Sequence, residues 1–432
     1  MSWMDYYRNR TISEEQAVRK IKNGNRVVLG HATGEPFFLV DAMMDNAENY
    51  KDVEIVHMFS LGKAAYCAPE MSGHFRHNSL FVSNQTRECI AEGRGDFTPA
   101  FFYKVPELFR DFLRVDVALV QVTPPNEDGY VSFGVSSDYT LGLTRSAKLV
   151  IAQVNRDMPW TYGANVVPIE DIHYFVEHDN PIPELPIPKL GEVERAIGRH
   201  CASLIEDGDT LQIGIGAIPD AVLHELRGKK DLGIHSEMIS DGVVDLVEAG
   251  VVTNARKAIH PGKSVVTFLM GTKRLYDYVN KNPDVEMYPV DYVNDPAVIA
   301  ENDHIVSINS CVQVDLYGEV CSEAIGYKQI SAAGGQVDFI RGASIAKHGR
   351  SILAMPSTAS KGKVSRIVPL LDEGACVTTT RYNMDYVVTE QGIARLKGKS
   401  LRGRAKALID IAHPDFKDGL IKEYERRFNT TW

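Results

Sequence analysis

Short apolar segments alternate with amphipathic helical segments along this chain, and this alternation limits its possible folds more than any other feature. The apolar segments are typical of buried strands, and strands that alternate with helices favour parallel sheets. Residues 304–326 look more like consecutive short strands, so we expect part of a sheet to be mixed. The predicted fold class is therefore α/β with largely parallel or mixed sheets. We predict strands at Arg26–Ala32, Val53–Met58, Val115–Val122, Leu149–Val154, Leu211–Ile215, Ser264–Leu269, Ile352–Met355 and Tyr386–Thr389.

A proline-rich segment divides the chain near its middle. Residues 180–190, NPIPELPIPKL, contain four prolines, which fix φ and remove backbone donors, so we expect an extended connector. A chain of 432 residues is also too long for one ordinary domain. We therefore predict domains at residues 1–185 and 186–432. The second domain is expected to open with a helix that ends near Gly208.

The two predicted domains share a sequence pattern. Ala17–Pro36 and Cys201–Pro219 each contain a helix end, a glycine, an apolar strand and a glycine-containing turn before a proline, with the same spacing between glycines. The sequence KDVEI at residues 51–55 also resembles KDLGI at residues 230–234. Two such repeats in the same order predict two related open α/β/α domains.

Composition excludes several classes of function. The chain has 47 basic and 57 acidic residues, a net charge of −10 and no basic run, so we expect no nucleic-acid surface. No stretch reaches the ~18 apolar residues of a membrane helix, and the first residues do not resemble a secretory signal, so we expect a cytoplasmic protein. The six cysteines lack a CxxC pair, which predicts free thiols and no metal site.

The segment LQIGIGAIP, residues 211–219, is the first candidate for a ligand site. A strand leads into Gly214-Ile215-Gly216, and Pro219 suits the first position of a helix. Glycines allow close approach of a ligand, and a helix start attracts a phosphate or an oxyanion. A tight turn without a ligand explains the same residues. The last glycine of a GxGxxG fingerprint is missing, which weakens a dinucleotide interpretation.

Two further segments place polar groups at the ends of predicted strands. In GIHSEMISDG, Glu237 follows a strand, where ligands bind in open α/β sheets, and Ser240 can cap the next helix. Read alone, Glu237 is more typical of a surface residue, and His235 is more typical of a core histidine. In SAAGGQVDFIRGA, Gly335 can point an N–H at a ligand or simply form a turn, and Asp338 and Arg341 can pair or contact a ligand.

The loops of the N-terminal half support a binding cleft without indicating a reaction. GHATGEP, SLGK and TPPNEDGYVSFG each follow a predicted strand and are rich in turn residues. The sequence contains no GxSxG elbow, HExxH motif or P-loop lysine.

Several segments together resemble the family I CoA-transferases of the acetyl-CoA hydrolase/transferase group, in particular the 4-hydroxybutyrate and butyrate type. They are LQIGIGAIPDAVL, GIHSEMISDGVVDL, FLMGTKRLYD, PVDYVNDP, GGQVDFIRGA and YVVTEQGIA, in this order. The resemblance covers essentially the whole chain. One departure is Gln391, where close relatives often have Tyr, which puts the acyl preference in doubt.

The resemblance implies a role for each of several residues. Glu237 is expected to be the nucleophile that forms a glutamyl-CoA thioester. The backbone N–H groups of Ile215 and Gly335 are expected to form the oxyanion hole. CoA contacts are expected at Gly214, Ile215, Gly216, Ala217, Ile218, Val312 and Gly335. No carboxylate-binding residue is assigned to the N-terminal loops.

The implied activity is CoA transfer between short-chain carboxylic acids by a ping-pong mechanism. The favoured acids are 4-hydroxybutyrate, butyrate and acetate, with itaconate or succinate as alternatives. An acyl-CoA hydrolase with the same intermediate and a CoA-binding sensor without turnover are further alternatives. We expect no tightly bound cofactor, with CoA and acyl-CoA as substrates. We also expect a homo-oligomer, specifically a dimer.

Overall fold

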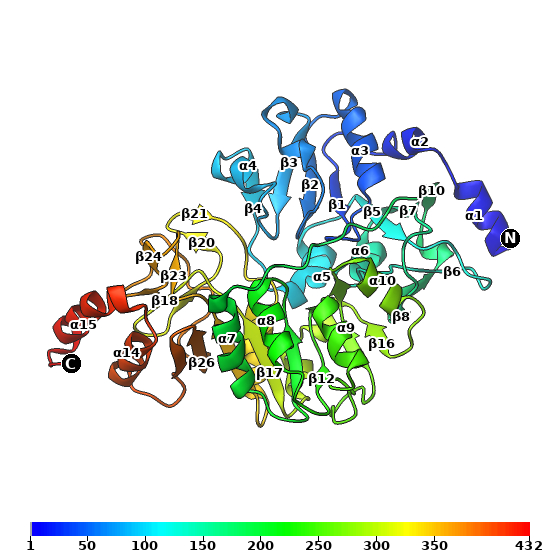
Figure 1. The fold of residues 1–432 in the computed structure, drawn as a ribbon. Coiled ribbons are helices and arrows are strands. Elements are labelled where there is room, and N and C mark those ends of the chain that lie inside the picture. Colours follow the sequence, from blue (N-terminus) through cyan, green and yellow to red (C-terminus); the bar gives the residue numbers. More distant parts are fainter. Residues whose placement is uncertain (1) are drawn as a thin grey trace. The chain divides into compact units, whose positions relative to one another are not determined.

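The computed structural model describes residues 2–432, which divide into two compact units (Figure 1). The first unit extends to Pro186 and also contains Val265–Val293, and the second contains Ile187–Ser264 and Asn294–Trp432. The chain passes into the second unit inside the proline-rich connector, which has no helix or strand.

The segment Val265–Val293 belongs to the first unit because its backbone hydrogen-bonds to residues far away in the sequence. The carbonyl of Thr267 accepts from the N–H groups of Ser137 and Asp138 at 2.9 and 3.1 Å. The N–H of Leu269 donates to Val135 at 2.9 Å. The sequence-based division, with one boundary at residue 185/186, placed this segment in the second domain.

The first unit is built on a seven-stranded sheet of order β10-β7-β5-β1-β2-β3-β4. All of its neighbouring strands pair in parallel. One core cluster packs apolar residues of the helices α2 (Glu14–Val18) and α3 (Phe37–Asp45) against β1 and β2. The strands are β1 (Arg26–Leu29), β2 (Val53–His57), β3 (Phe75–Ser79), β4 (Gly95–Phe97), β5 (Val117–Val122), β7 (Leu149–Val154) and β10 (Tyr174–Glu177).

Helices and short strands complete the first unit. The helices are α1 (Trp3–Arg10), α2 (Glu14–Val18), α3 (Phe37–Asp45), α4 (Arg87–Ala91), α5 (Val105–Glu107), α6 (Thr140–Ser146), α10 (Lys273–Val279) and α11 (Val290–Val293). The short strands include β6 (Tyr130–Ser132), which pairs with β9 (Val166–Pro168), and β8 (Tyr162–Gly163), which pairs with β16 (Val285–Met287).

The second unit is built on a six-stranded mixed sheet of order β12-β11-β17-β22-β26-β27. Its strands pair in parallel except for the edge strand β27, which is antiparallel to β26. Helices α7 (Glu192–Ser203) and α8 (Ala217–Glu225) pack together in front of β17 (Figure 1). The strands are β11 (Thr210–Ile213), β12 (Gly233–Ile234), β17 (Ile305–Asn309), β22 (Arg350–Ala354), β26 (Tyr386–Thr389) and β27 (Gly392–Arg395). These two sheets confirm the predicted α/β class.

The first helix of the second unit, α7, lies in the segment where the sequence predicts a helix. The helices of this unit are α7 (Glu192–Ser203), α8 (Ala217–Glu225), α9 (Asp241–Glu248), α12 (Pro296–Ala300), α13 (Gln336–Ile345), α14 (Leu401–Asp410) and α15 (Pro414–Phe428). A core cluster packs α13, α14 and α15 against Leu353 and Val387. The predicted consecutive strands in residues 304–326 are present as β17, β18 (Gln313–Asp315), β19 (Val320–Cys321) and β20 (Ala324–Ile325).

The two units repeat the same local geometry where the sequence repeats. The N–H of Gly24 donates to Lys51 at 2.9 Å, and the N–H of Gly208 donates to Lys230 at 2.9 Å. The aspartates that follow these two lysines both have a φ of +55°. Each segment leads into a strand that pairs in parallel with both of its neighbours, β1 in one unit and β11 in the other.

Each sheet has a topological switch point next to its repeated strand. In the first unit, β1 pairs with β2 on one side and with β5 on the other. In the second unit, β11 pairs with β12 on one side and with β17 on the other. Ligands of open α/β sheets bind at the carboxyl ends of the strands at such points. We therefore expect ligand-binding residues in the loops that follow β1 and β11.

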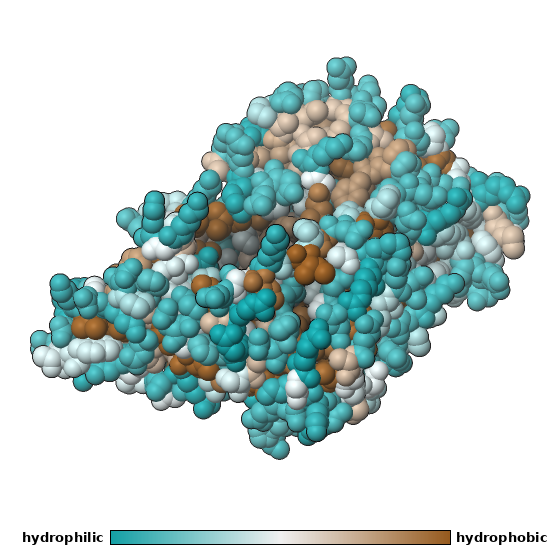
Figure 2. All heavy atoms as spheres, in the orientation of Figure 1, coloured by the Kyte–Doolittle hydropathy of each residue, from teal (hydrophilic) through white to brown (hydrophobic). Residues whose placement is uncertain are grey.

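Hydrophilic side chains cover most of the face drawn in Figure 2, and hydrophobic residues appear there in smaller groups. Within residues 2–432, no helix combines the length and apolar character needed to cross a bilayer.

Candidate active site

The loop that carries Glu237 is fastened to the end of β11. It follows β12, and the N–H of His235 donates to the carbonyl of Leu211 at 3.1 Å. The hydroxyl of Ser236 accepts from the N–H of Ile213 at 3.2 Å and donates to the Ile213 carbonyl at 3.1 Å. These bonds fix the backbone on the amino-terminal side of Glu237, whose side chain remains partly exposed.

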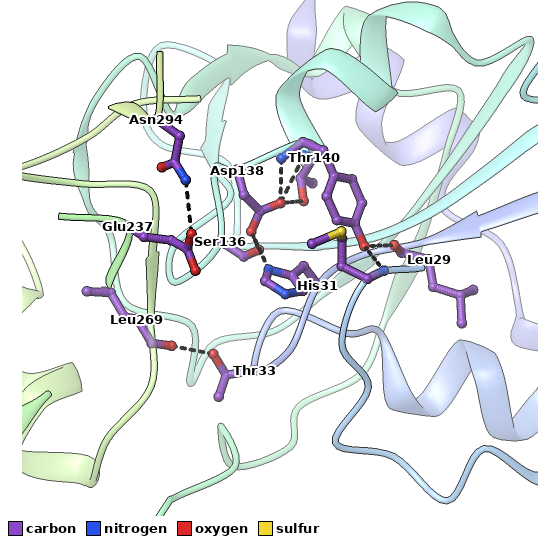
Figure 3. Close-up of polar contacts among 11 residues, drawn as sticks. Leu29, His31, Thr33, Ser136, Asp138, Thr140, Glu237, Leu269 and Asn294 are labelled. Carbon is purple, nitrogen blue, oxygen red and sulfur yellow. Dashed lines mark hydrogen bonds and ion pairs between the residues drawn. The ribbon is translucent and has the colours of Figure 1, made fainter. Parts of the chain in front are cut away.

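The carboxylate of Glu237 is held by a buried amide. Asn294 Nδ2 donates to Glu237 Oε2 at 2.9 Å (Figure 3). Asn294 is fully buried, and the same Nδ2 lies 3.4 Å from Asp338 Oδ2 in α13. The sequence motif PVDYVNDP contains Asn294, but sequence reasoning gave it no role. The only local signal was its position in a turn before Pro296, which starts α12.

Gly335 forms the other wall of this carboxylate site. It is the N-cap residue of α13, and a Cβ added to it would lie 1.7 Å from Glu237 Oε2 and 2.5 Å from Asn294 Nδ2. Only glycine therefore allows the carboxylate to pack against this backbone. The start of α13 is held by Gln336, whose amide donates to hydroxyls of Ser322 and Thr379 at 2.8 and 3.1 Å. The partial positive charge of a helix N-terminus favours a carboxylate at this position.

The glycine turn after β11 leaves open space for a ligand. Gly216 has a φ of +112°, which favours glycine, and a Cβ added to Gly214 or Gly216 would meet no atom within 4 Å. Ile215 is 39% exposed, although it is apolar. Helix α8 begins at Ala217, two residues before the predicted start at Pro219. The proline still lies in the first turn, where its missing N–H costs no intrahelical bond.

The structure places the predicted CoA-contact residues at one edge of the second sheet. Gly214–Ile218 follow β11, and Val312 follows the neighbouring strand β17, so the two segments flank the switch point. The N–H of Val312 donates to Cys321 at 2.9 Å. Glu237 and Gly335 are in contact, as described above. The roles assigned to these residues stay predictions.

Two other residues near Glu237 have structural partners. His235 is fully buried, and its ring lies edge-to-face with Phe339 at a centroid distance of 6.3 Å. Ser240 is the N-cap residue of α9, but its side chain makes no capping bond and instead donates to Asp220 Oδ1 at 3.4 Å. Burial raises the pKa of Asp220, and the Ser240 bond opposes this shift.

The first unit has its own polar cluster after β1. His31 Nδ1 donates to Asp138 Oδ2 at 3.0 Å, and both residues are buried (Figure 3). Asp138 also accepts from the Ser136 hydroxyl, from the Tyr139 N–H at 2.6 Å, and from the N–H and hydroxyl of Thr140 at 3.2 and 3.1 Å. The sequence indicated a glycine-containing loop here but could not reveal the pair, because its two members are far apart in the chain.

A second buried acid lies in the same loop. Glu35 is 1% exposed, and its Oε2 accepts from the Ser60 hydroxyl at 2.7 Å and from the Gly62 N–H at 3.3 Å. Burial raises the pKa of Glu35 to about 7 against the opposing effect of these bonds. A cavity of about 260 Å³ adjoins this residue. In the described part of the chain, no group of three or more His, Cys, Asp or Glu residues is arranged to bind a metal ion.

Comparison with known families identifies the chain. A family model of the acetyl-CoA hydrolase/transferase N-terminal domain matches residues 2–186, and a model of the C-terminal domain of the same family matches residues 271–424. The 4-hydroxybutyrate coenzyme A transferase of Clostridium kluyveri is 62% identical over 99% of this chain and 100% of its own length. The chain belongs to the acetyl-CoA hydrolase/transferase family.

Other members of this family agree in sequence and in structure. The succinyl-CoA:cyclohexane-1-carboxylate CoA transferase of Geobacter metallireducens is 44% identical over 99% of this chain and 98% of its own length. The crystal structure of 4-hydroxybutyrate CoA-transferase from Porphyromonas gingivalis matches with a TM-score of 0.86 and 46% identity, covering 99% of this chain and 100% of that one. The protein is a CoA-transferase.

Proposed function

We propose that this CoA-transferase moves CoA between short-chain carboxylic acids through a covalent thioester on Glu237. The observation that carries the proposal is the way this carboxylate is held. One of its oxygens accepts from the buried Asn294 amide at 2.9 Å and packs on the bare backbone of Gly335. The side chain is nevertheless partly exposed, so a substrate can reach it.

The chemistry needs no general base, because an ionised carboxylate is already a nucleophile. One Glu237 oxygen attacks the acyl-CoA carbonyl, which forms a mixed anhydride and releases CoA thiolate. The thiolate attacks the Glu237 carbonyl, which releases the first acid and leaves the glutamyl-CoA thioester. An incoming acid reverses these two steps and departs as the new acyl-CoA. The thioester bond is conserved throughout, so the exchange needs no ATP.

The backbone around Glu237 is suited to the charge that develops. Each tetrahedral intermediate carries an oxyanion, and we assign its stabilisation to the N–H groups of Ile215 and Gly335. Loss of one such donor typically costs about 3 kcal/mol of transition-state stabilisation. We assign CoA binding to Gly214–Ile218 and Val312, because both segments lie at the switch point of the second sheet. Binding of the long CoA body can then stabilise the reacting centre.

The proposed acids are 4-hydroxybutyrate, butyrate and acetate. The name of the Clostridium kluyveri relative supports the first, and a butyryl-CoA:acetate CoA-transferase of Anaerostipes caccae, 38% identical, supports the other two. The alternative acids are dicarboxylates such as itaconate or succinate. Gln391, where close relatives often have Tyr, is exposed between β26 and β27.

Hydrolysis of the acyl-CoA is the second candidate activity, since the family includes hydrolases. A steady-state screen separates the two activities. Butyryl-CoA, acetyl-CoA and itaconyl-CoA are each incubated with a series of acceptor acids and also without any acceptor. We expect new acyl-CoA only when an acceptor is present, with the Glu237→Gln variant inactive. Release of free CoA at the same rate without an acceptor would make the enzyme a hydrolase.

A further inference from the structure

The amide of Asn294 donates through one nitrogen to two carboxylates. Its Nδ2 lies 2.9 Å from Glu237 Oε2 and 3.4 Å from Asp338 Oδ2. All three residues belong to the second unit, and Asn294 and Asp338 are 0% and 1% exposed. An Asn amide has two orientations, related by a half-turn, which exchange Nδ2 and Oδ1. Glu237 receives a hydrogen bond from Nδ2 in only one of them.

The surroundings of Asn294 show what selects this orientation. Its Oδ1 is buried, and within residues 2–432 it accepts from no protein donor, so no hydrogen bond on that side of the amide holds it. In the turned orientation, Oδ1 would face two carboxylates and bring no hydrogen to either of them. The orientation of the amide therefore depends on the two acids, Glu237 and Asp338.

Asp338 and Asn294 belong to two elements that are packed tightly together. Asn294 directly precedes Asp295, the N-cap residue of α12, and Asp338 lies in the first turn of α13. The two helices approach so closely that a Cβ added to Gly342 in α13 would lie 2.4 Å from Ile299 Cγ2 in α12. The N-terminus of α13 favours a carboxylate in its ionised form. A charged acceptor is thus held in a fixed place beside the amide.

The charge on Glu237 changes during the proposed reaction, whereas Asp338 keeps its carboxylate. As a mixed anhydride or a CoA thioester, Glu237 is neutral, and its oxygen is a weaker acceptor than a carboxylate oxygen. In these two states, Asp338 is the remaining carboxylate on Asn294 Nδ2. The orientation of the amide then depends mainly on Asp338.

We propose that Asp338 is a positioning residue, whose carboxylate keeps Asn294 Nδ2 directed at Glu237 while Glu237 carries an acyl group or CoA. The inference rests on the proposed function, because it concerns the covalent states of Glu237. Without the charge of Asp338, the amide can turn its oxygen toward the thioester. The thioester carbonyl then loses a hydrogen bond that favours attack on it, and an incoming acid reacts more slowly.

The test measures how fast acetate discharges the enzyme–CoA thioester. The enzyme is first charged with butyryl-CoA, and small molecules are removed by rapid gel filtration. Acetate is then added. Its oxygen attacks the Glu237 thioester and releases CoA thiolate, which attacks the acetyl carbonyl of the anhydride, giving acetyl-CoA and the Glu237 carboxylate. Mass spectrometry of the quenched intact protein follows the loss of CoA.

Four enzymes are compared: the unsubstituted protein, Asp338→Asn, Asn294→Ala and the double variant. Asp338→Asn should slow discharge by about 5- to 30-fold, and by no more than Asn294→Ala does. In the Asn294→Ala background, the same substitution should change the rate less than about two-fold, because no amide is left to orient. Asp338→Ser, whose side chain is shorter and neutral, repeats the cycle so that the result does not depend on one variant folding.

The proposal is overturned if Asp338→Asn discharges CoA at the unsubstituted rate. It is also overturned if Asp338→Asn slows discharge equally with and without the Asn294 amide, because Asp338 would then not act through that amide. A merely structural role would lower stability without this dependence on Asn294, so the thermal unfolding of each variant is measured as well.

Asp385→Asn is the matched control for loss of a buried acid. Asp385 is 5% exposed, pairs with Arg395 at 3.5 Å, and precedes β26, at the sheet edge opposite the loop after β11. This substitution should lower the unfolding temperature but change the discharge rate less than about two-fold. If Asp385→Asn slows discharge as much as Asp338→Asn does, the assigned role of Asp338 is wrong.

Failure of this inference can be distinguished from failure of the proposed function. If the unsubstituted enzyme gains CoA on Glu237 and acetate removes it at a rate that ignores Asp338, only the positioning role is wrong. If the unsubstituted enzyme gains no CoA on Glu237, the proposed function itself is wrong.

Discussion

The buried carboxyl group of Glu35 makes the stability of the first unit depend on pH. Desolvation raises the pKa of Glu35 from 4.5 to about 7. Below pH 4.5 the folded and unfolded chains both carry the proton. Between pH 4.5 and about 7 only the folded chain keeps it, so the unfolding free energy falls as the pH rises. Above pH 7 the Glu35 carboxyl group is ionised in both the folded and the unfolded chain, so the unfolding free energy falls no further.

The size of this effect follows from the difference between the two pKa values. A difference of about 2.5 corresponds to about 3 kcal/mol of unfolding free energy. Glu35→Gln removes the titration and keeps an oxygen that can accept from Ser60. Between pH 5 and pH 8, we therefore expect the unsubstituted protein to lose about 2.5 kcal/mol relative to the variant.

Tryptophan fluorescence can follow this effect in the first unit alone. Trp3 and Trp160 lie in that unit and Trp432 lies in the other, so both proteins are prepared with Trp432→Phe. Urea unfolding is then measured at pH 5, 6, 7 and 8. The difference in unfolding free energy between the two proteins cancels the titration of all other groups. If that difference is the same at pH 5 and pH 8, the reasoning about Glu35 is refuted.

Three substitutions test the backbone and amide around the proposed nucleophile. Gly335→Ala should lower kcat by at least about 100-fold, because the added Cβ would displace the Glu237 carboxylate. In the control variant Gly419→Ala, the added Cβ meets nothing within 4 Å, so kcat should change less than about two-fold. Asn294→Ala should lower kcat by about 10- to 100-fold through loss of a hydrogen bond to a charged group, and unchanged kinetics would contradict the assigned contact. Gly216→Ala should lower the unfolding free energy by about 1–3 kcal/mol in urea unfolding, because the residue has a φ of +112°. Gly214→Ala, in the same open turn, should lower it less. Equal losses in the two variants would exclude backbone strain as the cause.

Much of the fold could be predicted because it depends on local pattern. The predicted strands at Leu149–Val154 and Tyr386–Thr389 have the observed bounds, and the other predicted strands differ at their ends or, at Ser264–Leu269, are split. The repeated glycine and lysine-aspartate segments have matching hydrogen bonds in the two units. Apolar periodicity and turn residues are local signals, so they can be read from a single sequence without an alignment.

What could not be predicted depends on contacts between distant segments. Asn294 is distant in sequence from Glu237, and His31 is distant from Asp138, so no spacing rule joins them. The return of Val265–Val293 to the first unit also depends on hydrogen bonds to residues 135–138. Glu237 and Gly335 were predicted because the motifs around them resemble those of a known family. Their positions in the chain alone did not distinguish a functional role from a structural one.

The central claim is that the Glu237 carboxylate becomes covalently joined to CoA. The most direct test incubates the enzyme with butyryl-CoA without an acceptor acid, quenches it in acid, digests it with pepsin and analyses the peptides by mass spectrometry. We predict that the peptide containing Glu237 gains the mass of CoA less one water, and that the Glu237→Gln enzyme gains nothing there. An unmodified Glu237 peptide, or an adduct on another residue, would contradict the claim.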